Sequence, residues 1–220
     1  MSVLTPQPIL RHLLDRLRVN YVDSALYTDD DVLTMLNDAY LDACESTMIL
    51  RTFTTVTLLA NQKEYDLPTD FSQLICAIAS GSQLDPISFQ EALLDFGSAP
   101  AVSSGYYTYS GKIGVIPTPS AATTGTLMLL YAARPTPFSS YDDGLDARFP
   151  IEFADLLLHW VRWRVQIISG GAERVAAAST DRSLYDNRLR EMRRTAETVT
   201  RIEPAQFGHV QTRRRSLNAR

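Results

Sequence analysis

The hydrophobic periodicity of this sequence changes twice, at Arg51 and at Phe149. Residues 28–50 carry apolar side chains at helical spacing, whereas residues 53–59 alternate and are rich in threonine, as in a strand. After Phe149 the helical period returns. Strands enclosed between two helical regions indicate an α+β protein, in which a β-rich segment is inserted into a helical framework.

The helix predicted over residues 28–50 has a clear start. Thr28 is a good N-cap, and Asp31 follows three residues later, which is a capping-box arrangement. The acidic run 29–31 suits a first helical turn, where it offsets the helix dipole, better than a metal site. A shorter amphipathic helix is predicted over residues 7–18. The stripe expected to be buried in the longer helix is Val32, Leu36, Ala39, Tyr40, Ala43 and Thr47.

The β-rich region is predicted to contain five or six strands. Ser110-Gly111 separates two extended runs and signals a hairpin. A short helix is predicted over residues 86–96. Besides 53–59, the expected strands cover residues 64–67, 74–79, 107–109, 113–116 and 126–133.

Two helices are predicted after Phe149. The first runs from Pro150, which is well placed at a first helical position, to about Ile168, and it is apolar on nearly every side. Gly170-Gly171 ends it. The second covers residues 172–202, and its apolar stripe is expected to pack on the preceding helix, on a neighbouring subunit, or on both. This stripe consists of Tyr185, Leu189, Met192, Ala196 and Val199.

These patterns divide the chain into four segments. Residues 1–50 hold the N-terminal helices of the framework, and residues 149–202 complete it with a C-terminal helical hairpin. Residues 51–148 form the inserted antiparallel β-rich subdomain. Residues 203–220 contain too little apolar surface to fold alone and are expected to form an extended basic arm.

The segment LANQKEYDLPTDFSQL, residues 59–74, is dense in turn-forming residues. Pro68 restricts the local backbone, and Thr69 or Asp70 is expected to cap a single helical turn that holds Phe71. We predict a rigid corner that sets the angle between framework and insert. The same features would also suit an ordinary connection between a strand and a helix. The corner residues are Tyr65, Leu67, Pro68, Asp70 and Phe71.

The net charge of −4 conceals an asymmetry along the chain. Residues 182–220 contain ten arginines and four acidic residues, so they carry +6 and the remaining residues carry −10. A basic C-terminal segment on an acidic body favours an anionic partner. That partner could be another protein, a nucleic acid or the acidic body of a neighbouring copy.

The sequence lacks the motifs of common enzymes. It has no nucleophile elbow, zinc-protease, phosphate-loop or dinucleotide-binding pattern. The three histidines lie on separate segments with no metal-ligand spacing around them. We therefore expect no catalytic activity, no metal and no cofactor. The histidines are His12, His159 and His209.

The remaining compositional signals concern location. Cys44 and Cys76 lie in apolar patterns and are expected to be two buried thiols. The longest apolar stretch, residues 154–168, is interrupted by charged side chains, so no membrane span is expected. The N-terminus lacks the pattern of a signal peptide. The protein is expected to be made and used, or assembled, inside a cell.

Nucleic-acid binding is the alternative function. The basic arm could contact phosphates, and the tyrosines Tyr106, Tyr107 and Tyr109 could stack on bases. Against this, the sequence pI is about 5.4, and tyrosines on a hairpin more often form cross-strand packing pairs. The alternative is thus a non-catalytic oligomeric protein that binds nucleic acid through its arm.

Three motifs in order resemble the head-to-tail adaptor, or connector, proteins of tailed bacteriophages. They are a threonine-rich strand followed by YDLPTDF, the hairpin GKIGVIPTP, and FPIEFADLL at the start of the penultimate helix. Together they span residues 28–200. Each motif is weak alone, and their order and spacing carry the resemblance.

The resemblance implies a structural protein that forms a ring, usually of twelve copies, beneath the portal. Such a ring joins the capsid to a tail or nozzle protein, and genomic DNA passes through it without sequence-specific contacts. The helical part would face the portal and the channel. The implied location is the head–tail interface of the virion, after assembly in the host cytoplasm. C-terminal arms of this family commonly grip the portal, which here points to Phe207, Arg213, Arg214 and Arg215.

Overall fold

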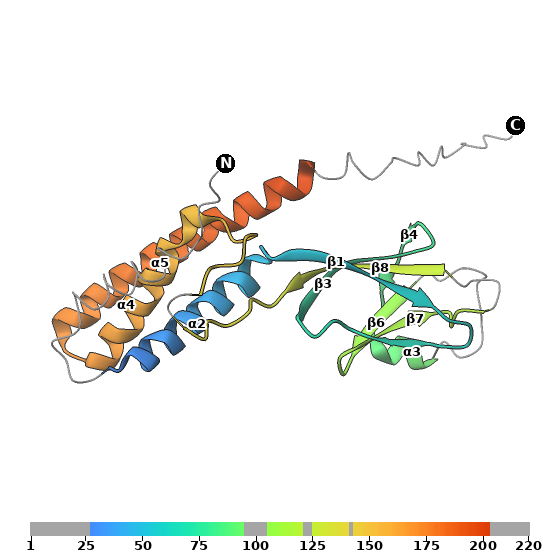
Figure 1. Cartoon of the computed structure of the whole chain (residues 1–220), viewed down its shortest axis with the longest axis horizontal. Coiled ribbons are helices and arrows are strands. Elements are labelled where there is room, and N and C mark those ends of the chain that lie inside the picture. Colours follow the sequence, from blue (N-terminus) through green and yellow to red (C-terminus); the bar gives the residue numbers. More distant parts are fainter. Residues whose placement is uncertain (1–26, 95–104, 121–124, 141–142, 203–220) are drawn as a thin grey trace, which may run out of the picture.

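The computed structural model describes residues 27–94, 105–120, 125–140 and 143–202. The helices gather at one end of an elongated molecule and the strands at the other (Figure 1). This combination of helices and sheets confirms the α+β class. The predicted helix 7–18 and arm 203–220 lie outside the described residues.

Helix α2 (Asp29–Thr47) begins at the predicted cap. The Thr28 hydroxyl accepts a hydrogen bond from the Asp31 N–H at 3.2 Å, and the Asp31 carboxylate accepts one from the Thr28 N–H at 2.9 Å. Both N–H groups would otherwise be unpaired at the helix start. Val32 is only half-buried. The rest of the predicted stripe is buried: Leu36, Ala39, Tyr40, Ala43 and Thr47.

Helix α4 (Asp155–Ser169) starts later than predicted, because residues Ile151–Phe153 form a separate 3-10 turn, η1. Pro150 has extended backbone and precedes that turn instead of occupying the first position of the long helix. Gly170 and Gly171 follow with φ of 67° and 93°, a region where side chains are strained and glycine is not. The predicted glycine break is therefore confirmed.

Helix α5 (Ala172–Ile202) has the predicted bounds. Its residues Tyr185, Met192 and Ala196 are buried, and Leu189 is half-buried against the core. The Tyr185 hydroxyl donates to the Asp42 carboxylate of α2. These four residues of the predicted stripe therefore pack inside the subunit, and the side chain of Val199 lies outside the described part.

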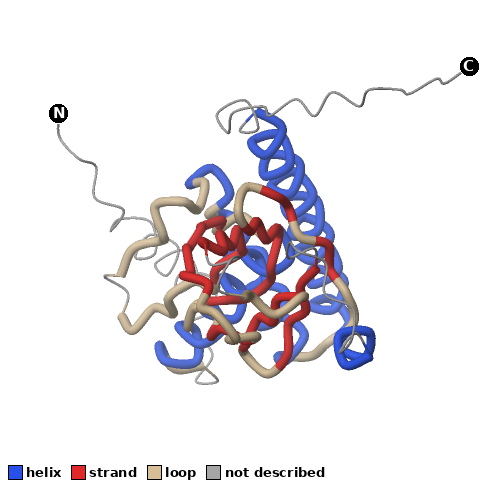
Figure 2. Tube along the Cα trace, turned by 90° about the vertical axis from the view of Figure 1, so that its right-hand side faces the viewer, coloured by secondary structure: helices blue, strands red, loops and turns tan. Residues whose placement is uncertain are grey.

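The strands form two four-stranded sheets. In Figure 2 the strands lie toward the viewer, and the long helices lie behind them. The first sheet has the order β1-β8-β3-β4, and the second has the order β2-β7-β6-β5. The described residues contain more strands than predicted, because the two-residue strands give no periodic signal. The bounds are β1 Arg51–Leu58, β2 Glu64–Asp66, β3 Phe71–Ala79, β4 Ser82–Gln83, β5 Asp85–Pro86, β6 Gly105–Tyr109, β7 Lys112–Ile116 and β8 Gly125–Ala133.

The pairing is antiparallel with one exception among the described strands. Strands β5 and β6 pair in parallel, so the sheet region is mixed at this point. Helix α3 (Phe89–Leu94) follows β5 and begins later than the predicted helix 86–96, because Pro86 belongs to the strand.

Strands β6 and β7 form the predicted hairpin. Ser110 and Gly111 occupy its turn with φ of 48° and 75°. Gly114 lies opposite Tyr107, and a Cβ atom at this glycine would collide with the Tyr107 ring. The glycine therefore makes room for an aromatic side chain across the hairpin.

A continuous buried cluster links the helices to both sheets. It includes Leu36 of α2, Leu157 of α4, Leu129 of β8 and Ile113 of β7. Cys44 is buried as predicted, and burial raises the pKa of its thiol. Cys76 is only half-buried, because it lies on the outer face of β3, so the prediction of two buried thiols was wrong for this residue.

Candidate functional site

The predicted corner, residues 65–71, connects β2 of the second sheet to β3 of the first. Tyr65 is buried, and its hydroxyl accepts a hydrogen bond from the Leu59 N–H at 3.0 Å. The same hydroxyl lies 2.9 Å from the Gln62 carbonyl oxygen, to which it can donate. Tyr65 thereby closes the turn between β1 and β2, in which Asn61 has a φ of 64°.

Leu67 and Pro68 connect the corner to the β6–β7 hairpin. The Leu67 N–H donates to the Gly111 carbonyl at 2.9 Å, and the Phe71 N–H donates to the Pro68 carbonyl at 3.0 Å. The side chains of Leu67 and Phe71 are half-buried and pack against the core. The backbone of the corner is therefore held on both sides of Pro68.

Asp70 does not cap a helical turn, contrary to the sequence-based prediction. Phe71 is the first residue of β3, and the Asp70 carboxylate accepts a hydrogen bond from the Tyr131 hydroxyl at 3.0 Å. Its backbone carbonyl accepts the Arg134 N–H at 2.6 Å. The Asp70 carboxylate bonds to Tyr131 and not to the backbone of a helical turn, because Tyr131 of β8 lies directly beside it. Sequence spacing does not reveal this contact.

The beginning of β3 also contacts the end of α2. The Ser72 hydroxyl donates to the Glu45 carboxylate at 3.2 Å, and Arg134 Nε lies 3.5 Å from the same carboxylate. The Ala133 N–H donates to the Leu50 carbonyl at 2.8 Å. These contacts join helix α2 to the first sheet next to the corner. We call residues 65–72 together with Glu45 and Arg134 the junction.

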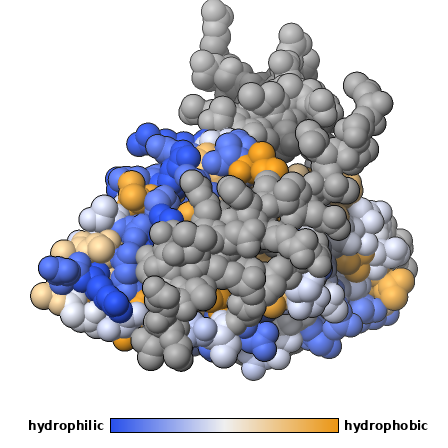
Figure 3. All heavy atoms as spheres, turned by 60° about the vertical axis from the view of Figure 1, so that its left-hand side comes forward, coloured by the Kyte–Doolittle hydropathy of each residue, from blue (hydrophilic) through white to orange (hydrophobic). Residues whose placement is uncertain are grey.

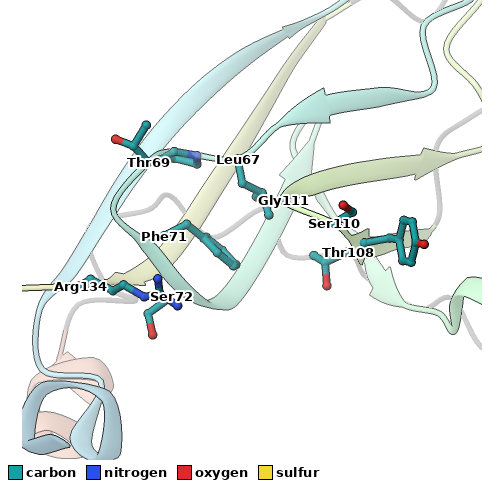
Figure 4. A pocket seen from close by; sticks show the side chains of 10 residues that line it. Leu67, Thr69, Phe71, Ser72, Thr108, Ser110, Gly111 and Arg134 are labelled. Carbon is teal, nitrogen blue, oxygen red and sulfur yellow. The ribbon is translucent and has the colours of Figure 1, made fainter. Parts of the chain in front are cut away.

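A depression with a volume of about 550 Å³ lies between the corner and the tip of the β6–β7 hairpin. In Figure 4, Leu67 and Phe71 lie on the corner side, and Thr108 and Ser110 lie on the hairpin side. Its only ionisable lining groups are Arg134 and the Tyr109 phenol. This set offers contact area and hydrogen bonds for a partner side chain but no nucleophile–base pair.

Two helices carry an acid–imidazole pair that the sequence analysis missed. His159 Nδ1 of α4 lies 2.9 Å from the Asp181 carboxylate of α5, and the Gln166 amide donates to the same carboxylate at 3.0 Å. No periodic signal could have found it, because the residues lie on different helices. Among the described residues, no three His, Cys, Asp or Glu side chains lie close enough to hold a metal ion. His12 and His209 lie outside those residues.

Several arginines of the basic C-terminal segment make contacts inside the subunit. Arg188 is paired with Asp155 at 2.8 Å and with Glu191 at 3.0 Å. Arg193 donates to the Ser46 carbonyl at 2.8 Å. Part of the excess charge in residues 182–220 therefore stabilises α5 against α2 and α4. The proposed portal contacts, Phe207, Arg213, Arg214 and Arg215, lie outside the described residues.

The hairpin tyrosines form packing contacts, which weakens the base-stacking alternative. Tyr107 is buried, and its hydroxyl donates to the Glu64 carboxylate at 2.8 Å. Tyr109 is exposed, and its ring stacks on Phe89 with 4.5 Å between centroids. Tyr106 is half-buried against the core. These rings are therefore held by neighbouring protein groups.

The turn between α4 and α5 exposes apolar side chains. Ile167, Ile168 and Val175 are 49%, 62% and 55% exposed. We call these three residues the apolar tip. Hydrophilic residues cover much of the visible described surface at the helical end of the molecule, with hydrophobic spots among them (Figure 3). Exposed apolar side chains gathered at one place favour contact with another protein.

The junction joins helix α2 to the first sheet, and the apolar tip favours contact with another protein. The family model of the SU10 adaptor protein matches residues 10–206, and the chain belongs to this family. It is therefore a phage adaptor, a structural component of the virion, and the resemblance noted in the sequence is confirmed. No curated protein matches the sequence. No helix in the described part of the chain is both long enough and apolar enough to span a membrane.

Proposed function

We propose that this adaptor forms a ring of twelve identical subunits that docks beneath the portal and joins the capsid to a tail or nozzle protein. The observation that carries the proposal is the family match over residues 10–206. Genomic DNA would pass through the ring channel without sequence-specific contacts. The ring would assemble in the host cytoplasm.

The junction would set the geometry of each subunit in this ring. Residues 1–50 and 149–202 would form one helical framework, and residues 51–148 would form the β insert. Glu45 bonds to Ser72, and Asp70 bonds to Tyr131, so helix, corner and sheet are held together. A fixed angle between framework and insert is needed because an error in one subunit is repeated around a closed ring.

The helical framework would face the portal, and the β insert would face outward or toward the tail. The apolar tip supports this orientation, because its three exposed side chains would lose their water contacts against a partner. Phe207, Arg213, Arg214 and Arg215 of the arm would add portal contacts. Their positive charges would favour an acidic surface on the portal.

Mass photometry of the protein alone and with its portal tests the proposal at low and moderate salt. The expected result is a large complex of fixed stoichiometry that forms only with the portal, and its mass gives the copy number. Ile168→Asp in the apolar tip should weaken the complex. Leu184→Asp, at an exposed apolar position of α5 outside the tip, is the matched control and should not weaken it.

Two outcomes would contradict this function. One is no association with the portal under any salt condition. The other is salt-sensitive binding to added DNA without portal binding, which would favour the arm as a nucleic-acid-binding element.

A further inference from the structure

From Thr52 to Leu58, strand β1 has an edge that no other described strand pairs with. It pairs with β8 in continuous antiparallel register, and the Ala133 N–H donates to the Leu50 carbonyl. In an antiparallel ladder, bonded residues alternate along the strand. Thr52, Thr54 and Val56 therefore bond to β8, whereas the backbone groups of Phe53, Thr55 and Thr57 point away from it. Among the described strands, only β8 pairs with β1, so these outward groups have no strand partner.

This edge lacks the features that normally prevent strand pairing. Edge strands are usually kept short, bulged or marked by charged residues or proline. Strand β1 has eight residues, its pairing with β8 has no register shift, and no side chain from Thr52 to Leu58 is charged. The opposite edge of the same sheet, β4, has only two residues. The edges of the first sheet are therefore unequal.

The outer face of the sheet beside this edge is apolar. Phe53 is 67% exposed, and its cross-strand neighbour Leu130 is half-buried. The next pair along the strands is Thr55 with Met128, and Met128 faces Ile78 of β3. Cross-strand partners share one face of a sheet. An unpaired edge and a partly exposed apolar face thus occur at the same place.

We propose that β1 pairs with β1 of a second copy, antiparallel and about a two-fold axis. In the described part of the chain, the outer strands β2, β4 and β5 have at most three residues each, so β1 is the best match for itself. The proposed register places Thr54 opposite Thr54 of the second copy and overlaps seven of the eight residues of β1. Phe53 then lies opposite Thr55 of the second copy, an aromatic–β-branched pair that favours sheet formation. Because β1 is uncharged from Thr52 onward, the strands meet without like-charge repulsion there.

This pairing differs from the contacts of the proposed ring. A two-fold contact closes on itself and leaves no surface for a further copy, whereas a ring needs two different surfaces on each subunit. The dimer is therefore the form of the free protein, and its β1 contact opens before ring assembly. It would keep the unpaired edge covered until the portal is present.

Sedimentation velocity of the full chain without portal tests the dimer. The wild type should dimerise with rising concentration. Thr55→Pro should shift the protein to monomer. The proline removes an N–H that points to the open edge, and the hydrogen bonds between β1 and β8 stay in place. Phe53→Asp should do the same without a backbone change. Leu184→Asp, at an exposed apolar position of α5, should leave the dimer intact.

Cysteine cross-linking tests the register. Thr54 of the two copies would form a non-hydrogen-bonded pair, with Cα atoms about 4.5 Å apart, which is close enough for a disulfide. Thr54→Cys should give a covalent dimer on oxidation. Val56→Cys, on the same face of β1, should give no covalent dimer. The wild type is the control for cross-linking through Cys44 and Cys76. A monomer at every concentration, an oligomer unaffected by both Thr55→Pro and Phe53→Asp, or equal cross-linking at positions 54 and 56 would overturn the proposal.

Discussion

The Tyr131 hydroxyl donates a 3.0 Å hydrogen bond to the Asp70 carboxylate, across 61 residues of sequence. Tyr131 lies on β8, between β1 and β3, and Asp70 lies in the turn that leads into β3. Burial and this hydrogen bond raise the pKa of Tyr131 to about 12. The corner is therefore attached to the middle of the first sheet by a side chain as well as by its backbone.

Removing the Asp70 carboxylate should weaken the fold. We expect Asp70→Ala to lower the free energy of unfolding by about 1–2 kcal/mol, because the Tyr131 hydroxyl loses its partner. Urea unfolding measures the change. Asp66→Ala is the matched control. This carboxylate is 88% exposed, and its ion pair with Lys112 is long, at 3.9 Å, so its loss should change the stability little. Equal losses in the two variants would show that the Tyr131 bond does not stabilise the corner.

Phe71→Ala tests the packing of the corner. A fully buried phenylalanine would cost about 3–5 kcal/mol, but Phe71 is half-buried, so we expect about 2 kcal/mol. The centroid of its ring lies 5.7 Å from that of the Tyr131 ring. The alanine would lose this ring contact and the packing of Phe71 against the core. Thermal unfolding provides the measurement. A melting temperature equal to that of the wild type would mean that Phe71 does not hold the corner.

Gly114→Ala tests the hairpin packing. The new methyl group would collide with the buried Tyr107 ring, and we expect a loss of about 1–3 kcal/mol from overpacking. The double variant Gly114→Ala with Tyr107→Ala should relieve the collision. Urea unfolding of both variants shows whether the loss comes from the collision with Tyr107 or from any side chain at position 114. Wild-type stability in the single variant would contradict the contact.

Asp146 should make stability depend on acid pH. Hydrogen bonds from the Arg148 guanidinium, at 2.6 and 2.9 Å, lower the pKa of the Asp146 carboxyl below 3.8. A lowered folded-state pKa contributes stability above about pH 3.8 that is lost as pH falls through the folded value. Urea unfolding at about pH 6 and about pH 3 should show a smaller difference for Asp146→Asn than for the wild type. If the free energy of unfolding changed equally with pH in both proteins, Asp146 would not contribute to the pH dependence.

Deleting residues 203–220 tests the arm. The segment has too little apolar surface to contribute a core, so we expect the melting temperature to stay unchanged. Association with the portal should be lost. A version with Arg213, Arg214 and Arg215 changed to glutamine separates the role of charge from that of length. Unchanged co-assembly of the truncated protein would contradict the proposed arm.

The element types could be predicted because their signals are local. Thr28 and Asp31 begin α2 with hydrogen bonds across three residues, and Ser110-Gly111 determines a turn through its own φ angles. Gly170 and Gly171 end α4 for the same reason. The family resemblance also depended on such motifs in their order, since each one marks a turn or a helix start.

The contacts of the candidate site depended on the tertiary structure. Asp70 had several possible partners within hydrogen-bonding reach of a turn, and only the packing of β8 beside β3 selected Tyr131. The same is true of His159, whose partner Asp181 lies on another helix. Likewise, the unpaired edge of β1 exists because β8 covers only one side of it. The sequence by itself determined where the longer helices and strands and the glycine turns occur, because caps, glycines and periodicity act over a few residues. Only the tertiary structure decided which distant side chains meet and which edge remains unpaired, because both depend on how the sheets and helices pack.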